Sequence, residues 1–358
     1  MVGGGTPDTT VSSLWNGDIQ WFTPTEVGHQ KYVSKSARTI TQLGLQKSSA
    51  KKLPAGSILL SSRATIGECS IAQRECTTNQ GFQNLIPKKD TNNEFLYYLA
   101  QTKKHHFIKY ASGSTFLEIS NSEIKKTKCT VPGTEEQTQI AAFLSALDDR
   151  IAVQNKIIED LKILKKELCN RVFSKGSAVR LSELIEEVTI RNKSNTCDNV
   201  LSVSNKMGFI KQSEQFEDRT IASENKSNYK VVTKGCFAYN PARINVGSIA
   251  LLSSHSVGII SPMYVCFKAK NVLDSTYLSF YYQSDFFARE LQKKLEGSVR
   301  QCLTYENMRE IIIPYVNVER QREIATALNR FTMLIATEEK CLKALQKQKS
   351  YFLNAMFI

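Results

Sequence analysis

The side chains best suited to chemistry in this sequence are polar groups in loops, and their chemistry is hydrogen bonding rather than bond breaking. Arg63 and Arg243 each follow a short apolar run, in the segments 61–65 and 239–245. An arginine in such a loop can pair with a guanine edge through two hydrogen bonds, and Asn or Gln can do the same with adenine. The residues predicted to contact DNA on this basis are Arg63, Thr65, Asn79, Gln80, Ser114, Thr115, Tyr239, Asn240, Arg243, Asn245, Ser298 and Arg300.

Motifs for catalysis or metal binding do not occur in this sequence. It contains no G-x-x-x-x-G-K-[ST], no H-E-x-x-H and no G-x-S-x-G, which hold phosphate groups, zinc and nucleophilic serines respectively. The nine cysteines include no C-x-x-C pair, so we expect reduced thiols in a cytoplasmic protein rather than a zinc site or disulfides. Residues 240–243 read Asn-Pro-Ala-Arg and depart from the N-P-P-aromatic motif of amino-methyltransferases at the last two positions. We therefore expect no catalytic residue, no metal ligand and no cofactor bound by this chain.

Net charge favours nucleic acid as the partner. Lys and Arg number 47 against 34 Asp and Glu, a formal balance of +13, which attracts the phosphate backbone over long range. A membrane surface would suit the same charge, but no apolar run approaches the ~18 residues of a membrane span, and charges along the long helical segments alternate in sign. We expect a soluble protein without a membrane partner, and 358 residues predict two domains.

An internal repeat organises the chain. Residues 136–144 recur at 320–328, an offset of 184, and the offset decreases slightly toward the start of each repeat. The matched pairs are Gln137 and Gln321, Gly113 and Gly297, Phe173 and Phe357, Phe95 and Tyr277, and Arg63 and Arg243. Such self-similarity indicates two copies of one structural plan.

Each repeat reads as a mixed unit of strands and helices, so we predict the α/β class (mixed α+β). A short apolar run follows Pro54-Ala55-Gly56 in the first repeat and Lys234-Gly235 in the second. This order is typical of turns that lead into buried strands. An amphipathic helix follows in each repeat, over 94–108 and 275–295. Its aromatic residues are predicted to be core rather than a stacking platform.

A long helix closes each repeat. Thr134 can cap the first of them, and Gln137 completes a capping-box pattern. Apolar residues then recur at alternating spacings of four and three, so we predict an antiparallel coiled coil. The alternative is two independent helices that lie on their own domains, but about 38 residues make a rod of roughly 55 Å, longer than such a domain is wide. The predicted seam residues are Leu144, Leu147, Ile151, Ile158, Leu161, Leu328, Phe331, Ile335, Leu342 and Leu345, with polar interruptions at Gln154 and Glu338 and at Lys165 and Lys349.

The two repeats place different polar residues at the same loop positions. A symmetric homodimer reads a palindrome, whereas two divergent units in one chain should read two unlike half-sites. The predicted target is therefore a split, asymmetric sequence with an unread spacer.

With these features, the whole chain closely resembles the specificity subunit of Type I restriction-modification systems. The resemblance rests on the duplicated order of the R-x-x-x-G loops, the Asn79-Gln80-Gly81 turn, the loop at Gly113, and helices of which the first opens P-x-x-x-E-Q-x-x-I-A. It implies two target recognition domains, each of which reads half of a bipartite site in double-stranded DNA, and a helical spacer that sets the gap. It also implies two modification subunits that methylate adenine with S-adenosylmethionine, and restriction subunits that cleave DNA with ATP and Mg. All three cofactors are expected on those partner subunits.

We divide the chain into a first target recognition domain at 1–133, a first spacer helix at 134–176, a second target recognition domain at 177–316 and a second spacer helix at 317–358. The first domain begins roughly ten residues late, because 179–187 have no counterpart before Val2. In a circular organisation the missing piece would lie beside Ile358. Two further hypotheses are an assembly adaptor that binds modification subunits with only partial DNA readout, and a self-sufficient methyltransferase or nuclease, which the missing cofactor motifs disfavour.

Overall fold

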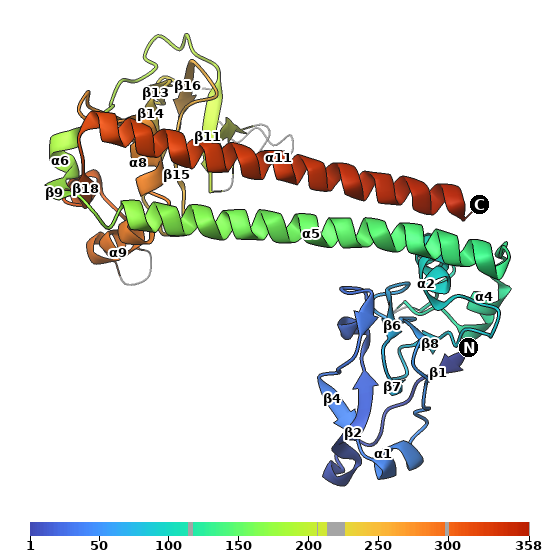
Figure 1. Ribbon diagram of the computed structural model, residues 1–358. Helices are drawn as coiled ribbons and strands as arrows, with labels where there is room; N and C mark the ends of the chain where they lie inside the picture. Colours follow the sequence, from blue (N-terminus) through green and yellow to red (C-terminus); the bar gives the residue numbers. More distant parts are fainter. Residues whose placement is uncertain (114–116, 206, 213–225, 298–300, 358) are drawn as a thin grey trace. The chain divides into compact units, whose positions relative to one another are not determined.

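The computed structural model describes residues 1–113, 117–205, 207–212, 226–297 and 301–357 (Figure 1). The chain forms two compact units. Unit 1 comprises Met1–Asn155 together with Cys341–Ile358, and unit 2 comprises Lys156–Lys340. Unit 1 is thus built from both ends of the sequence.

The strands of unit 1 are short and form small mixed sheets, because turn residues interrupt the apolar runs. One sheet has the order β4 (Arg38–Ile40), β2 (Trp15–Phe22), β7 (Cys76–Thr78). A second has the order β3 (Tyr32–Val33), β6 (Cys69–Ala72), β5 (Ile58–Leu60), and β1 (Val2–Gly3) pairs with β8 (Gln83–Asn84). In both three-stranded sheets the central strand has one parallel and one antiparallel neighbour.

The helices of unit 1 are α1 (Gln42–Gln46), α2 (Asn93–Thr102), α3 (Lys104–Lys109) and α4 (Asn121–Lys126), with short 3-10 turns at Ser12–Leu14 and Pro24–Glu26. The single helix predicted over 94–108 is wrong. It breaks at Lys103, whose N–H donates to the carbonyl of Ala100 at 3.2 Å, a three-residue spacing that tightens the last turn and ends α2. The aromatic residues of α2 are buried as predicted. Tyr97 and Tyr98 belong to the cluster that contains Ile58, Leu60 and Ile71, whereas Phe95 packs with Leu99 and Ala141.

The described part of unit 2 contains two four-stranded sheets and a two-stranded one. The first has the order β10 (Ile185–Glu187), β17 (Val265–Ala269), β14 (Cys236–Tyr239), β15 (Ile249–Leu251). The second has the order β12 (Gly208–Lys211), β11 (Val200–Ser204), β16 (Val257–Ile260), β13 (Lys230–Thr233). The pair is β18 (Ile312–Tyr315) with β9 (Ser177–Arg180), whereas the matching residues 128–131 of unit 1 belong to no strand.

The helices of unit 2 are α6 (Leu181–Leu184), α8 (Ser275–Tyr281), α9 (Asp285–Lys294) and α10 (Tyr305–Arg309), with a 3-10 turn at Ile244–Val246. The single helix predicted over 275–295 is also wrong. The first part ends at Tyr281, and Ser284 caps the second, because its Oγ accepts the N–H of Phe287 at 3.1 Å. Tyr277, Phe280 and Tyr281 are core residues as predicted.

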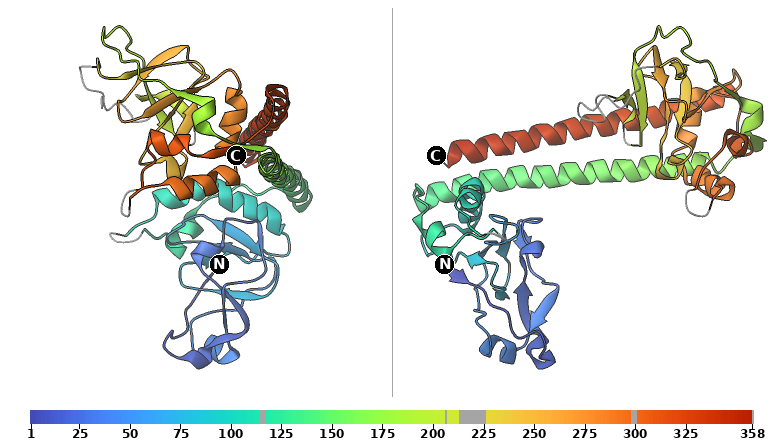
Figure 2. Two further views of the ribbon diagram at one scale, coloured as in Figure 1. Left: turned by 90° about the vertical axis from the view of Figure 1, so that its left-hand side faces the viewer. Right: turned by 180° about the vertical axis from the view of Figure 1, so that it is seen from behind.

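Two long helices, α5 (Thr134–Val172) and α11 (Val318–Met356), pack together as an antiparallel coiled coil (Figures 1 and 2). In unit 1, Asp148 pairs with Lys349; in unit 2, Lys162 lies 2.7 Å from Glu339. The partner residue number falls as the α5 number rises, which is the order of an antiparallel pair.

The seam residues are the buried face of these helices. Six of the ten predicted residues are buried: Leu144, Leu147, Ile158, Leu328, Ile335 and Leu345. Ile151, Leu161, Phe331 and Leu342 are partly buried. The predicted spacing of four and three therefore marks the face that packs.

Candidate nucleic-acid interface

The loop after β5 in unit 1 is a tight turn held by its own backbone. The Gly67 N–H donates to the Ser61 carbonyl at 3.0 Å, and the Ser62 N–H donates to the Gly81 carbonyl at 2.8 Å. Gly67 has φ +83°, a left-handed conformation that a side chain would strain. The second bond fastens this loop to the turn at 79–81, so the structure brings Arg63, Thr65, Asn79 and Gln80 into one cluster.

Within that cluster, Arg63 is held by an acidic residue. Its Nε donates to Glu118 Oε2 at 3.0 Å, and its terminal nitrogen forms an ion pair with the same oxygen. The Arg63 side chain is 42% exposed, so it reaches the surface with its direction fixed by Glu118. Ser114 and Thr115, which the sequence also nominates, lie outside the described residues.

The other three residues of the cluster also have partners. The Thr65 hydroxyl donates to the Pro24 carbonyl at 3.2 Å, and Asn79 Oδ1 accepts the Gly81 N–H at 2.9 Å. Gln80 is exposed and accepts a hydrogen bond from the Thr6 hydroxyl. Asn79 thus shapes the turn, whereas Gln80 offers its side chain to a ligand.

In unit 2, two of the predicted contact residues serve the fold. Tyr239 is fully buried among the core aromatics, and its hydroxyl donates to the Thr304 carbonyl at 3.1 Å. The prediction that Tyr239 contacts DNA is wrong for this conformation, because the side chain lies on the inner face of β14. Asn240 is 9% exposed, and its Oδ1 accepts the Ala242 N–H at 3.0 Å, which closes an Asx turn.

Two other residues of the same segment face outward. Arg243 and Asn245 are exposed on the turn that ends at Gly247, whose φ is +86°. Asn205 reaches this turn from the end of β11, where its Nδ2 donates to the Val246 carbonyl at 3.4 Å. Arg243 makes no side-chain hydrogen bond or ion pair with any residue that the structure describes. Ser298 and Arg300 lie outside the described residues.

The residue that pairs with Arg63 has a different counterpart in unit 2. The Ile119 N–H donates to Ser62 O at 3.0 Å, one residue before Arg63, and the Leu303 N–H donates to Pro241 O at 3.1 Å, two residues before Arg243. Residues 118 and 302 match at the 184-residue offset, and Glu118 is replaced by Cys302. Without a carboxylate beside it, Arg243 is left for an external partner.

Each long helix is joined to its domain by a buried glutamine. Gln137 Oε1 accepts the Asn92 N–H at 2.9 Å, and Gln321 Oε1 accepts the Asp274 N–H at 2.7 Å. Each Nε2 donates to two backbone carbonyls, those of Pro132 and Asp90 in unit 1 and those of Val316 and Val272 in unit 2. The capping-box role predicted for Gln137 is wrong, because its side chain fixes α2 to α5. The sequence signal for this role was the repetition of Gln at the 184-residue offset.

Buried cysteines lie in the cores of the two units. Burial raises the pKa of the Cys69, Cys76 and Cys266 thiols to about 12, so these thiols are protonated at neutral pH. Among the residues that the structure covers, no group of three His, Cys, Asp or Glu could hold a metal ion. No helix in that part of the chain is long and apolar enough to cross a membrane.

A family model matches this chain twice, once in each repeat. The sequence profile of the Type I restriction modification DNA specificity domain matches residues 2–162 and again 179–347. The MjaIX specificity subunit of a Type I restriction enzyme from Methanocaldococcus jannaschii is 40% identical over 177 residues, which are 48% of this chain and 41% of that protein. This match therefore spans about two fifths of the relative's length.

Two solved structures share the fold. The S subunit of a Type I restriction-modification system from M. genitalium matches with a TM-score of 0.54 and 17% identity, over 99% of this chain and 96% of that one. A chain from a structure titled for complex assembly and conformational transition of the Type I system matches with a TM-score of 0.63 and 15% identity, over 99% and 94%. Because the profile covers both repeats, this chain belongs to the Type I restriction-modification DNA specificity family.

Proposed function

We propose that this chain is the DNA-recognition subunit of a Type I restriction-modification complex, and that it reads a bipartite asymmetric site. The observation that carries the proposal is the pair of matched loops with different chemistry. One scaffold presents an arginine fixed by Glu118 in unit 1 and an unpaired arginine in unit 2. Different groups at equivalent positions suit two unlike half-sites.

The chemistry that follows recognition belongs, in this proposal, to partner subunits. Two modification subunits methylate adenine with S-adenosylmethionine, and restriction subunits use ATP and Mg to cleave DNA. The recognition chain itself is non-catalytic and binds none of these cofactors. A cytoplasmic location fits the nine free cysteines, seven of them at least partly buried.

The experiment that tests this function is to co-express the chain with modification subunits from the same genome and to map methylated adenines by single-molecule sequencing. We expect one split asymmetric motif with a constant gap. Methylation that ignores one half of the motif would contradict bipartite readout and support the adaptor hypothesis, which the family comparisons do not favour. A control with the chain omitted separates its contribution from background methylation.

A further inference from the structure

Unit 1 contains a polar network where its globular part meets the long helices. Lys31 Nζ lies 2.9 Å from Glu94 Oε2 and 3.3 Å from the Tyr98 hydroxyl. Tyr98 donates to Asp148 Oδ2 at 2.6 Å, and Lys349 forms an ion pair with the other oxygen of Asp148. Both ammonium groups of this network thus have a carboxylate partner.

The repeat offsets map part of this network onto unit 2 with the same geometry. Lys349 Nζ lies 5.6 Å from the centre of the Tyr98 ring, and Lys165 Nζ lies 5.2 Å from the centre of the Phe280 ring. Lys165 matches Lys349 at the 184-residue offset, and Phe280 matches Tyr98 at the offset of their own helices. The lysine and the ring beneath it are therefore conserved between the two units.

The carboxylates are not conserved between the units. Thr332 stands at the position that matches Asp148, and Thr276 at the position that matches Glu94. Lys165 makes no ion pair or hydrogen bond with the residues that the structure describes. Burial lowers the pKa of Lys165, which marks an ammonium group that lacks a compensating charge.

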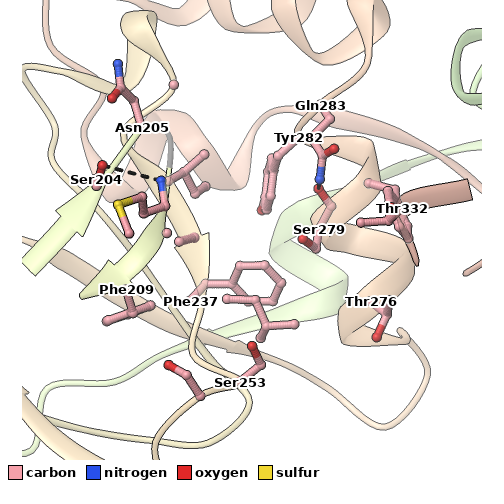
Figure 3. A pocket seen from close by; sticks show the side chains of 18 of the residues that line it. Ser204, Asn205, Phe209, Phe237, Ser253, Thr276, Ser279, Tyr282, Gln283 and Thr332 are labelled. Carbon is pink, nitrogen blue, oxygen red and sulfur yellow. Dashed lines mark hydrogen bonds between the residues drawn. The ribbon is translucent and has the colours of Figure 1, made fainter. Parts of the chain in front are cut away.

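A cavity of about 870 Å³ opens beside this lysine, wholly within unit 2 (Figure 3). In Figure 3, Thr276 and Ser279 of α8 and Tyr282, the residue after it, lie on one side of the cavity, and Ser204 of β11 and Phe209 of β12 lie across from them. No Asp or Glu is among the residues known to line it. The Tyr282 ring lines the cavity, but its hydroxyl is buried away from solvent and has no hydrogen-bond partner among the described residues.

We propose that this cavity binds the carboxylate of a small organic acid, which pairs with Lys165 as Asp148 pairs with Lys349. The volume lies within the range of small-molecule sites, about 300–1,000 Å³, and exceeds what one acidic side chain would fill. The hydroxyls of Thr276 and Ser279 can donate to the ligand, and the rings of Phe237 and Phe280 cover its apolar part. The Thr332 hydroxyl donates to the Leu328 carbonyl at 3.1 Å, so its oxygen can only accept. Bound acid then supplies in unit 2 the negative charge that Asp148 supplies in unit 1.

Saturation-transfer NMR on the full-length chain tests this proposal with sodium benzoate and sodium citrate as probes and benzamide as the uncharged control. We expect saturation transfer to the two acids and little to benzamide. Thr332→Asp places the carboxylate of unit 1 beside Lys165, so it should weaken benzoate binding about tenfold or more. Lys165→Met should do the same because it removes the cation.

Thr337→Asp is the matched control, since it adds the same charge to α11 at an exposed position outside the cavity. It should bind benzoate as the unaltered chain does. Equal binding by Thr332→Asp and the unaltered chain, or no transfer to either acid from the unaltered chain, would overturn the proposal. Displacement of bound benzoate by an added modification subunit would also overturn the proposal. It would indicate that a carboxylate side chain of that subunit, rather than a small acid, pairs with Lys165.

Discussion

Arg63 and Arg243 occupy matched loops, yet their surroundings give them different tasks. Glu118 neutralises and orients Arg63, whereas Arg243 is exposed and lacks a partner in the described part of unit 2. An arginine oriented in advance loses less entropy on binding a base edge, because its side chain is already ordered. The free arginine depends more on the ligand for its conformation.

We expect Arg243→Ala to weaken binding to specific DNA by about 1–3 kcal/mol and to leave thermal unfolding unchanged, since the side chain is exposed. Fluorescence anisotropy with cognate and random duplexes at one salt concentration measures the first effect. The same change at Arg63 should weaken the other half-site by a similar amount. Equal losses on cognate and random DNA would show phosphate contacts in place of base readout.

The Glu94 carboxylate predicts a pH dependence for unit 1. Burial alone would raise the pKa of Glu94, but hydrogen bonds from Tyr32, Ser145 and Lys31 outweigh it and lower that pKa. A carboxylate with a lowered pKa stabilises the fold above its unfolded value of about 4.3, and this contribution is lost as the pH falls through the folded pKa.

Thermal unfolding between pH 6 and pH 3, about the range over which carboxylates titrate, should therefore show a smaller decrease in stability for Glu94→Gln than for the unaltered chain. Glu135→Gln is the control, because Glu135 is exposed at the start of α5. Identical pH profiles for Glu94→Gln and the unaltered chain would contradict this role of the Lys31–Glu94 pair.

At the scale of elements, the buried glutamines fix the long helices to their domains. Gln137 and Gln321 are 3% and 0% exposed, and each satisfies one N–H and two carbonyls of the backbone. Loss of such a side chain leaves several buried polar groups unpaired, and each costs about 1–3 kcal/mol.

Gln137→Ala should lower the free energy of unfolding by about 2 kcal/mol or more and increase proteolysis at the junction of α2 and α5. Gln139→Ala is the matched control, because Gln139 is exposed two residues along the same helix. Urea denaturation followed by circular dichroism measures both variants. A Gln137→Ala chain as stable as the control would refute the anchoring role.

Periodicity predicted the long helices well, because a repeat of four and three over about 35 residues has few structural alternatives. The apolar pattern did not predict the helix breaks at Lys103 and at 282–284, because apolar residues continue at helical spacing on both sides of each break. The role of Tyr239 could not be read from its loop-like neighbours, since the direction of a side chain on a short strand depends on register. The sequence alone could not show that Lys165 lacks a carboxylate partner, because the equivalent pair in unit 1, Lys349 and Asp148, joins two helices far apart in the chain.

At the scale of the molecule, the proposed function leads us to expect that α5 and α11 set the gap between the two DNA half-sites. Seven residues added to both helices, one heptad each, would lengthen the pair by about 10 Å and keep the seam in register. We expect the methylated motif to gain about three base pairs in its gap and to keep both half-sites, at roughly 3.4 Å per base pair.

Genome-wide methylation mapping of this variant reads the gap directly. The same insertion in α5 alone is the control, because it shifts the seam of one helix against the other and should abolish methylation. An unchanged gap after insertion in both helices would show that the coiled coil does not set the spacing.

Each core is completed by a phenylalanine that directly follows a long helix: Phe357 follows α11 and lies in unit 1, and Phe173 follows α5 and lies in unit 2. Phe357 packs against Phe95 with ring centres 5.0 Å apart, and Phe173 packs against Tyr277 at 4.9 Å. During synthesis the ribosome delivers Phe95 long before Phe357, so unit 1 leaves the exit tunnel first but its core is completed last. The core of the first domain therefore stays incomplete while the whole of unit 2 is translated. During that period chaperones and proteases have most access to the chain.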